Sequence, residues 1–118
     1  MTLEDLKKKI EKFADLHYIY FKDEGHLVWR FGTGYNIEIL DIEAYKKRQG
    51  IGTKLIRELV SGLGENPSVS IFGFTKEIND DAKSFYKALG FRLSPVIKDL
   101  YRKGGILFII NYKDIRNI

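Results

Sequence analysis

The feature that most constrains the fold is the segment Asn36–Leu63, where an apolar run leads through a basic glycine turn into an amphipathic stretch. The run Ile37–Ile42 is rich in β-branched residues, which favour a strand. The turn over residues 45–54 reads Tyr-Lys-Lys-Arg-Gln-Gly-Ile-Gly-Thr-Lys. Apolar residues then recur at helical spacing, at Ile51, Leu55, Ile56, Leu59, Val60 and Leu63. The segment therefore predicts a strand, a turn and a helix in direct succession.

The turn has the composition of an anion site. Gly50 and Gly52 let a backbone come close to a ligand, and the first amides of a helix are unpaired donors at the positive end of its dipole. Lys47, Arg48 and Lys54 add positive charge. No G-x-x-x-x-G-K-[ST] and no G-x-G-x-x-G after a strand is present, which removes the support for a kinase-like or dinucleotide site. The turn has two interpretations. It either binds a pyrophosphate or is an ordinary crossover whose glycines only relieve crowding.

Two segments resemble a known family. Residues 47–52, Lys-Arg-Gln-Gly-Ile-Gly, resemble the acyl-coenzyme A signature R/Q-x-x-G-x-G/A of the GNAT superfamily of N-acetyltransferases, with Lys47 as the departure. Residues 79–91, Asn-Asp-Asp-Ala-Lys-Ser-Phe-Tyr-Lys-Ala-Leu-Gly-Phe, resemble the family's N-x-x-A-x-x-F-Y-x-x-L-G-F segment. Two matches in the family's order indicate membership over the part of the chain from Ile37 to Phe91.

The resemblance implies acetyl-CoA as co-substrate and no metal. In the family, two neighbouring parallel strands splay apart and the pantetheine arm pairs with the exposed edge of the central strand. Asn79 matches a residue often near the pantetheine, with a helix N-cap as its alternative role. The cofactor-binding residues implied are Leu40, Asp41, Ile42, Lys47, Arg48, Gln49, Gly50, Ile51, Gly52, Thr53 and Asn79.

The family's chemistry is direct attack of a neutral amine on the thioester, which needs a proton route and a donor for the leaving thiolate. Tyr86 matches a tyrosine near the thioester sulfur in many members, so its phenol is the expected donor; packing beside Phe85 is the alternative. Strand alternation puts Glu38, Leu40 and Ile42 on one face. Glu38 is therefore a candidate base, with a structural ion pair to a lysine, or water as the base, as alternatives.

The remaining elements complete an α/β domain. The Ile37 strand, the helix and a strand at Val69–Phe74 form a crossover, which predicts that the two strands are parallel. Asn79 is the expected cap of a further helix that ends at Gly90. The other expected elements are a helix at Thr2–Leu16 and strands at His17–Lys22, Leu27–Phe31, Phe91–Arg102 and Ile106–Tyr112. The fold class is a mixed, mostly antiparallel sheet of about six strands with a central parallel splayed pair and about three helices.

Composition narrows the function classes. The 118 residues suit a single domain. Zero cysteines exclude disulfides, zinc-thiolate sites and a thiol nucleophile, and a cytoplasmic protein without membrane segments is expected. His17 and His26 have no partner at metal-like spacing and are read as structural or surface residues. The net charge of +4 is spread along the chain, so it is only weak evidence for nucleic-acid binding.

The amino-terminal part is shorter than in the family, which usually has an extra strand and a second helix before the meander. The acceptor cleft is therefore expected to be either more open or completed by a second copy of the chain. The sequence as a whole indicates an N-acetyltransferase that acts on a primary amine of unknown identity. A catalytically idle CoA-binding regulatory domain and a small basic nucleic-acid-binding module are the alternatives.

Overall fold

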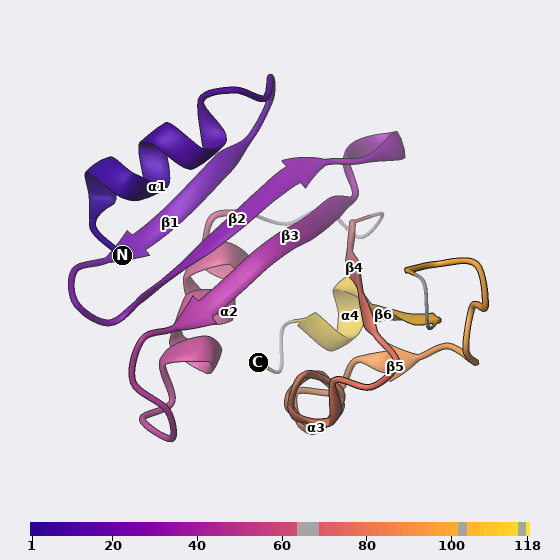
Figure 1. Ribbon diagram of the computed structural model, residues 1–118. Coiled ribbons are helices and arrows are strands. Elements are labelled where there is room, and N and C mark those ends of the chain that lie inside the picture. The colour runs from indigo at the N-terminus through magenta and orange to yellow at the C-terminus, as the bar shows by residue number, and fades with distance from the viewer. Residues whose placement is uncertain (64–68, 102–103, 116–117) are drawn as a thin grey trace.

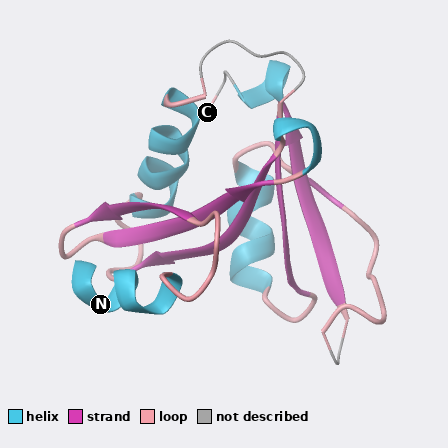
Figure 2. Ribbon diagram, turned by 90° about the horizontal axis from the view of Figure 1, so that it is seen from above, coloured by secondary structure: helices cyan, strands magenta, loops and turns pink. Residues whose placement is uncertain are grey.

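The computed structural model describes residues 1–63, 69–101, 104–115 and 118. Within these ranges, six strands form one sheet in the order β1-β2-β3-β4-β6-β5, and helices cover both of its faces (Figure 1 and Figure 2). Only the β3–β4 pairing is parallel among these strands. The predicted mixed, mostly antiparallel sheet is confirmed. No helix in the described ranges has the length and apolar content needed to cross a membrane.

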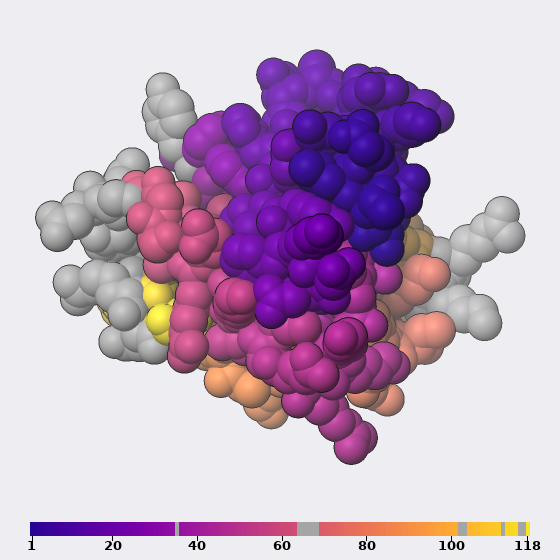
Figure 3. All heavy atoms as spheres, turned by 90° about the vertical axis from the view of Figure 1, so that its left-hand side faces the viewer, coloured from indigo at the N-terminus to yellow at the C-terminus, as the bar shows by residue number. Residues whose placement is uncertain are grey.

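The elements lie along the chain in the following order. They are α1 (Leu3–Ile10), β1 (His17–Phe21), β2 (Gly25–Phe31), the 3-10 turn η1 (Thr33–Tyr35), β3 (Ile37–Ala44), α2 (Ile51–Ser61), β4 (Ser70–Lys76), α3 (Asp80–Ala88), β5 (Arg92–Leu93), β6 (Gly105–Asn111) and α4 (Tyr112–Ile115). Residues of the amino-terminal half, from indigo to magenta, form most of the surface on the β1 side (Figure 3).

The first helix is shorter than predicted. Thr2 caps α1 through a reciprocal pair of hydrogen bonds with Asp5, as a capping box does. The helix ends at Ile10, and Phe13, inside the predicted range, is 63% exposed. Asp15 has a left-handed φ of 65°, which a helix does not tolerate. The chain reverses here to enter β1, so the prediction of a helix to Leu16 was wrong.

The crossover from β3 through α2 to β4 carries the core. The helix α2 packs against β1, β2 and β3, and its buried residues belong to one core cluster with buried residues of β3, β4 and β6. The parallel ladder joins Ile37–Ile39 to Ile71–Gly73, and both strands then continue without pairing to each other. The predicted parallel pair is thus confirmed, and its ladder covers only the first part of β3. The two strands diverge beyond this ladder (Figure 1).

The carboxy-terminal part departs most from expectation. The predicted strand Phe91–Arg102 is reduced to Arg92–Leu93 in β5, followed by a single bridge between Ile97 and Gly105. Pro95 has no backbone N–H to extend the ladder, so strand pairing stops there. Arg102 and Lys103 of the predicted hairpin turn lie outside the described residues. The short helix α4 follows β6 directly, and the sequence patterns did not anticipate it.

Candidate active site

A cleft of about 870 Å³ opens where β3 and β4 diverge, between the amino-terminal end of α2 and the side of α3. Most of the residues singled out by the sequence line it, although they come from three separate elements and one turn. They are Leu40, Asp41, Ile42, Lys47, Arg48, Gln49, Gly50, Ile51, Gly52, Thr53, Asn79 and Tyr86. Glu38 is not among the residues that line the cleft.

The turn before α2 presents unpaired backbone donors to the cleft. Arg48 and Gly50 have left-handed φ values of 63° and 70°, which curl the chain into the start of the helix. The first helical hydrogen bond is donated by the amide of Lys54 to the carbonyl of Gly50 at 3.0 Å. The amides of residues 51–53 therefore have no helical acceptor, and they lie at the positive end of the helix dipole. This end of the cleft therefore has the free donors and the dipole that favour an anion.

The basic side chains around this turn fall into two groups. Lys47 and Arg48 are exposed and have no ion-pair partner among the described residues. The ammonium of Lys54 is instead bound to the carboxylate of Glu24 at 2.8 Å and lies over the ring of Phe21. Lys54 also does not line the cleft, whereas Lys46, Lys47 and Arg48 do, so these three basic side chains of the turn can meet a ligand there.

Gly52 makes the close contact between α2 and α3 possible. A Cβ atom at this position would lie 2.9 Å from Cε1 and 3.0 Å from Cζ of Phe85. Both distances are shorter than ordinary van der Waals contact. Glycine at this position therefore keeps the amide end of α2 against the ring of Phe85, which lines the same cleft.

Tyr86 is fixed by stacking at the inner end of the cleft. Its ring lies 3.6 Å from that of Phe108 at an interplanar angle of 10°, and Phe108 occupies the space left by the missing side chain of Gly73. The residue is only 3% exposed, yet its hydroxyl has no hydrogen-bond partner among the described residues. Burial, with the negative charge of Asp41, raises the pKa of Tyr86. The phenol is therefore a protonated, unengaged donor at neutral pH.

Comparison with solved structures identifies this architecture, although no protein-family model and no curated protein matches the sequence. The ribosomal-protein-S18-alanine N-acetyltransferase from Escherichia coli superposes with a TM-score of 0.71 at 15% identity over 89% of this chain and 76% of its own. A Bacillus cereus acetyltransferase of the GNAT family gives 0.67 at 19% identity over 92% and 77% of the two chains. Arabidopsis thaliana Naa50, bound to the bisubstrate analogue CoA-Ac-MVNAL, gives 0.67 at 16% identity over 95% and 82%. The chain has the GNAT acetyltransferase fold.

The two segments that resemble GNAT motifs meet across the cleft. Residues 47–52 form the end of the cleft with the free amides, and residues 79–91 supply Asn79, the N-cap of α3, and Tyr86 of α3. The side chain of Asn79 also accepts a hydrogen bond from the amide of Ala82 at 3.1 Å, so the predicted N-cap is confirmed.

The side-chain alternation predicted for β3 was wrong. Val28 of β2 pairs with Asp41, but the next residue, Trp29, pairs with Ile39, so Leu40 is an extra residue in β3. Such a β-bulge changes which side chains share a face. Glu38 and Asp41 therefore lie on one face of the sheet, while Ile42 returns to the core side.

Glu38 lies on that face, away from the cleft. Its carboxylate accepts a hydrogen bond from Nε of Arg30 at 2.9 Å, and the two residues are cross-strand partners. The geometry supports the structural ion-pair alternative for this residue, with an arginine in the role expected of a lysine.

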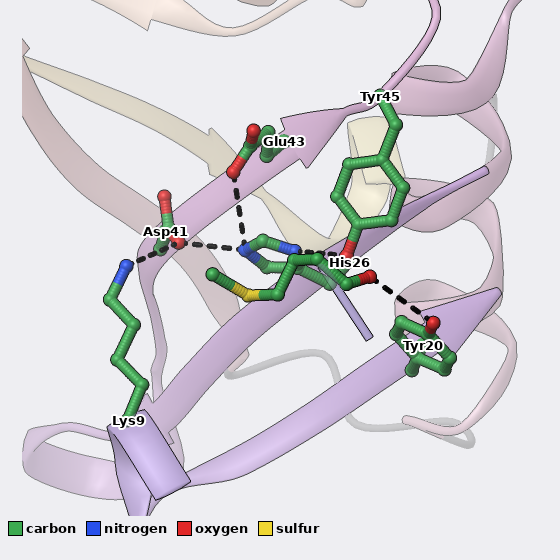
Figure 4. Close-up of polar contacts among 7 residues, drawn as sticks. Lys9, Tyr20, His26, Asp41, Glu43 and Tyr45 are labelled. Carbon is green, nitrogen blue, oxygen red and sulfur yellow. Dashed lines mark hydrogen bonds and ion pairs between the residues drawn. The ribbon is translucent and has the colours of Figure 1, made fainter. Parts of the chain in front are cut away.

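The sequence analysis reads His26 as a structural or surface residue and does not foresee its partners. The side chain is fully buried, and its ring lies between Asp41 and Tyr45 on the same face as Asp41 (Figure 4). These residues are 15 and 19 positions away along the chain, so no short motif links them. The sequence does carry one signal for these contacts, a histidine in a strand that neighbours a strand with acidic residues. Using this signal requires the pairing register of the two strands.

Proposed function

We propose that this protein is a GNAT N-acetyltransferase that uses acetyl-CoA to acetylate a primary amine. One observation carries the proposal. A single cleft joins the free amides and unpaired cations of the glycine turn to the open part of β3 and to the Tyr86 phenol. Along this path, the free amides and cations suit an anionic pyrophosphate, and the open part of β3 suits an arm that contains amides. The Tyr86 phenol suits a leaving thiolate.

Different parts of the cleft would bind different parts of acetyl-CoA. The amides of residues 51–53, with Lys47 and Arg48, would hold the pyrophosphate. The open edge of β3 from Leu40 to Ile42 would pair with the pantetheine amides, which places the thioester close to the fork of the two strands. Acetyl-CoA supplies an activated acyl carbon when bound. The amine would attack the thioester directly, so no covalent enzyme intermediate is needed. Tyr86 would donate its proton to the departing sulfur.

Titration calorimetry with acetyl-CoA at moderate salt tests the binding step. Saturable 1:1 binding is expected, and its absence would overturn the proposal. Changing Lys47 and Arg48 together to glutamine should weaken binding and flatten its salt dependence, because neither charge has an ion-pair partner in the part of the chain that the structure describes. Lys54→Gln is the matched control, since this lysine is held by Glu24 outside the cleft, and it should change the affinity much less.

Release of free thiol on adding primary amines tests the transfer step. Thiol release that depends on both protein and amine supports an acetyltransferase. Binding without any such release would identify a catalytically idle CoA-binding domain. Tighter binding of nucleic acid than of acetyl-CoA, abolished by the same double substitution, would favour the nucleic-acid-binding module.

A further inference from the structure

A buried hydrogen-bonded chain links the glycine turn to the open part of β3. Nδ1 of His26 lies 2.7 Å from the hydroxyl of Tyr45, and Nε2 lies 2.9 Å from Oδ2 of Asp41 (Figure 4). Tyr45 is the first residue of the basic turn, and Asp41 follows the bulged Leu40. Both nitrogens of the imidazole are thus engaged, and the ring is 0% exposed. His26 cannot touch a substrate, so any part it plays must act through its two partners.

One assignment of donors and acceptors satisfies all three side chains of this chain. Burial, together with the negative charges of neighbouring groups, raises the pKa of Tyr45 to about 12. Its phenol is therefore protonated at neutral pH and can donate to Nδ1 of His26. In the tautomer that carries its proton on Nε2, the phenol donates to Nδ1 and the imidazole donates that proton to Asp41, so each group has a partner. The carboxylate of Asp41 is held in one orientation by a donor that water does not reach.

Asp41 occupies a position between two hollows. It lines the cleft of about 870 Å³ described above and also a second cavity of about 540 Å³ beneath α1 and the turn that follows it. Leu40 and Asp41, at the β3 bulge, are the residues common to both linings. The Asp41 side chain is 38% exposed. A molecule entering from the α1 side would therefore meet this carboxylate before it reached the open part of β3.

We propose that Asp41 removes the proton from the acceptor ammonium, and that His26 and Tyr45 are positioning residues that hold Asp41 for this step. The proposal rests on the acetyltransferase function proposed above. One proton passes from the ammonium nitrogen to Asp41 and then to solvent. The neutral amine attacks the thioester carbon, the C–N bond forms and the C–S bond breaks. Tyr86 gives its proton to the thiolate, the nitrogen releases its second surplus proton to solvent, and Tyr86 takes one proton back from solvent. The net products are an amide, free thiol and one proton.

Charges of both signs surround Asp41, because Lys9, Lys12 and Arg30 line the second cavity with it, and Arg30 is paired with Glu38. From β3, the Glu43 carboxylate lies 3.8 Å from Nε2 of His26 and is exposed. From α1, the ammonium of Lys9 lies 3.7 Å from Oδ2 of Asp41 and is itself 59% exposed. An exposed pair at this distance is weak, so an acceptor ammonium can replace Lys9 beside the two carboxylates.

The first experiment compares amines that differ in charge. Butylamine is an ammonium ion at pH 7 and must lose a proton before attack, whereas semicarbazide is already neutral. Asp41→Asn keeps an acceptor for His26 but removes the base. With butylamine, its thiol release should fall on the order of 10²-fold or more at nearly constant CoA affinity. With semicarbazide the loss should be much smaller, and raising the pH should restore activity with butylamine.

Substitutions of His26 test positioning. His26→Gln can still donate an N–H to Asp41 and should retain most of the turnover, while His26→Leu removes the donor and should lower kcat with little change in KM for acetyl-CoA. Thermal unfolding identifies variants that fail to fold. For the folded parent, nitrogen NMR of His26 provides a measurement that needs no acceptor. We expect a proton on Nε2, protected from exchange, and a bare Nδ1.

Four outcomes would overturn the proposal in distinguishable ways. If Asp41→Asn keeps the turnover of the parent with butylamine, Asp41 is not the base, although the transfer reaction stands. A loss of turnover confined to Glu38→Gln would assign the base to Glu38. Acetyl-CoA binding without amine-dependent turnover in the parent removes the transfer reaction itself. His26, Asp41 and Glu43 also offer ligand atoms within 4.8 Å of one another. Stoichiometric zinc binding that displaces the Nε2 proton would make this cluster a metal site instead.

Discussion

Replacing Tyr86 with phenylalanine removes one oxygen atom from the inner end of the cleft. The ring volume is unchanged, so stacking on Phe108 at 3.6 Å should persist. The Tyr86 hydroxyl has no hydrogen-bond partner among the described residues, so no buried hydrogen bond is lost. The free energy of unfolding should therefore change by less than about 1 kcal/mol, which is the range of a single net hydrogen bond.

The effect on turnover should be much larger. If the phenol protonates the departing thiolate, thiol release at saturating acetyl-CoA should fall on the order of 10²-fold or more. A hundredfold loss corresponds to about 2.7 kcal/mol of transition-state stabilisation. The CoA affinity measured by calorimetry should stay nearly constant, because the interaction is made only as the C–S bond breaks. A steady-state thiol assay and chemical denaturation measure the two quantities separately.

Tyr18→Phe is the matched control, since it makes the same chemical change on β1, outside the lining of the cleft. It should alter neither quantity appreciably. Full turnover in Tyr86→Phe would remove the phenol from the mechanism and leave thiolate release to solvent or a backbone donor. A loss of stability well above 1 kcal/mol would show instead that the hydroxyl makes a structural hydrogen bond.

Three further predictions concern packing and titration. Gly52→Ala should lower stability by about 1–3 kcal/mol, because its Cβ meets Phe85 at 2.9 Å; Phe85→Leu in the same chain should restore most of the loss, and an undiminished unfolding midpoint for Gly52→Ala alone would contradict this. The Tyr45 phenol should titrate near pH 12 instead of 10, seen as the alkaline absorbance difference between the parent and Tyr45→Phe. Since that folded-state pKa is raised, the stabilisation is present below pH 10 and is lost as the pH rises towards 12, so the parent should lose stability more steeply there than the variant. Thr2→Ala should cost about 1 kcal/mol by removing the α1 cap, and an unchanged denaturation midpoint would show that α1 contributes little to global stability.

Local patterns were sufficient for the elements whose formation depends on neighbouring residues. The apolar period of residues 51–63 and the glycine before it placed α2 to within two residues of its end at Ser61, because an amphipathic face and a helix start are both encoded over a few positions. Asn79 was predicted as a cap for the same reason. The parallel pairing of β3 and β4 was predicted from the order of strand, helix and strand. The fold class follows from the order of these elements.

The composition of the cleft was also largely within reach of the sequence. Segments 47–52 and 79–91 each carry a local pattern, and together they contribute residues from both sides of the cleft. Their meeting follows from the crossover, which is a rule of topology that needs no coordinates.

The tertiary structure alone decided which side chains face each other. One extra residue at Leu40 moves Asp41 onto the face of Glu38, and strand alternation from the sequence cannot show it because a bulge is set by pairing with β2. The same pairing brings His26 to Asp41, and helix packing brings Gly52 against Phe85. These contacts join residues many positions apart in the chain. Their geometry depends on strand register and on close packing, which are properties of the whole sheet and its helices, whereas local sequence determines only the elements that come together.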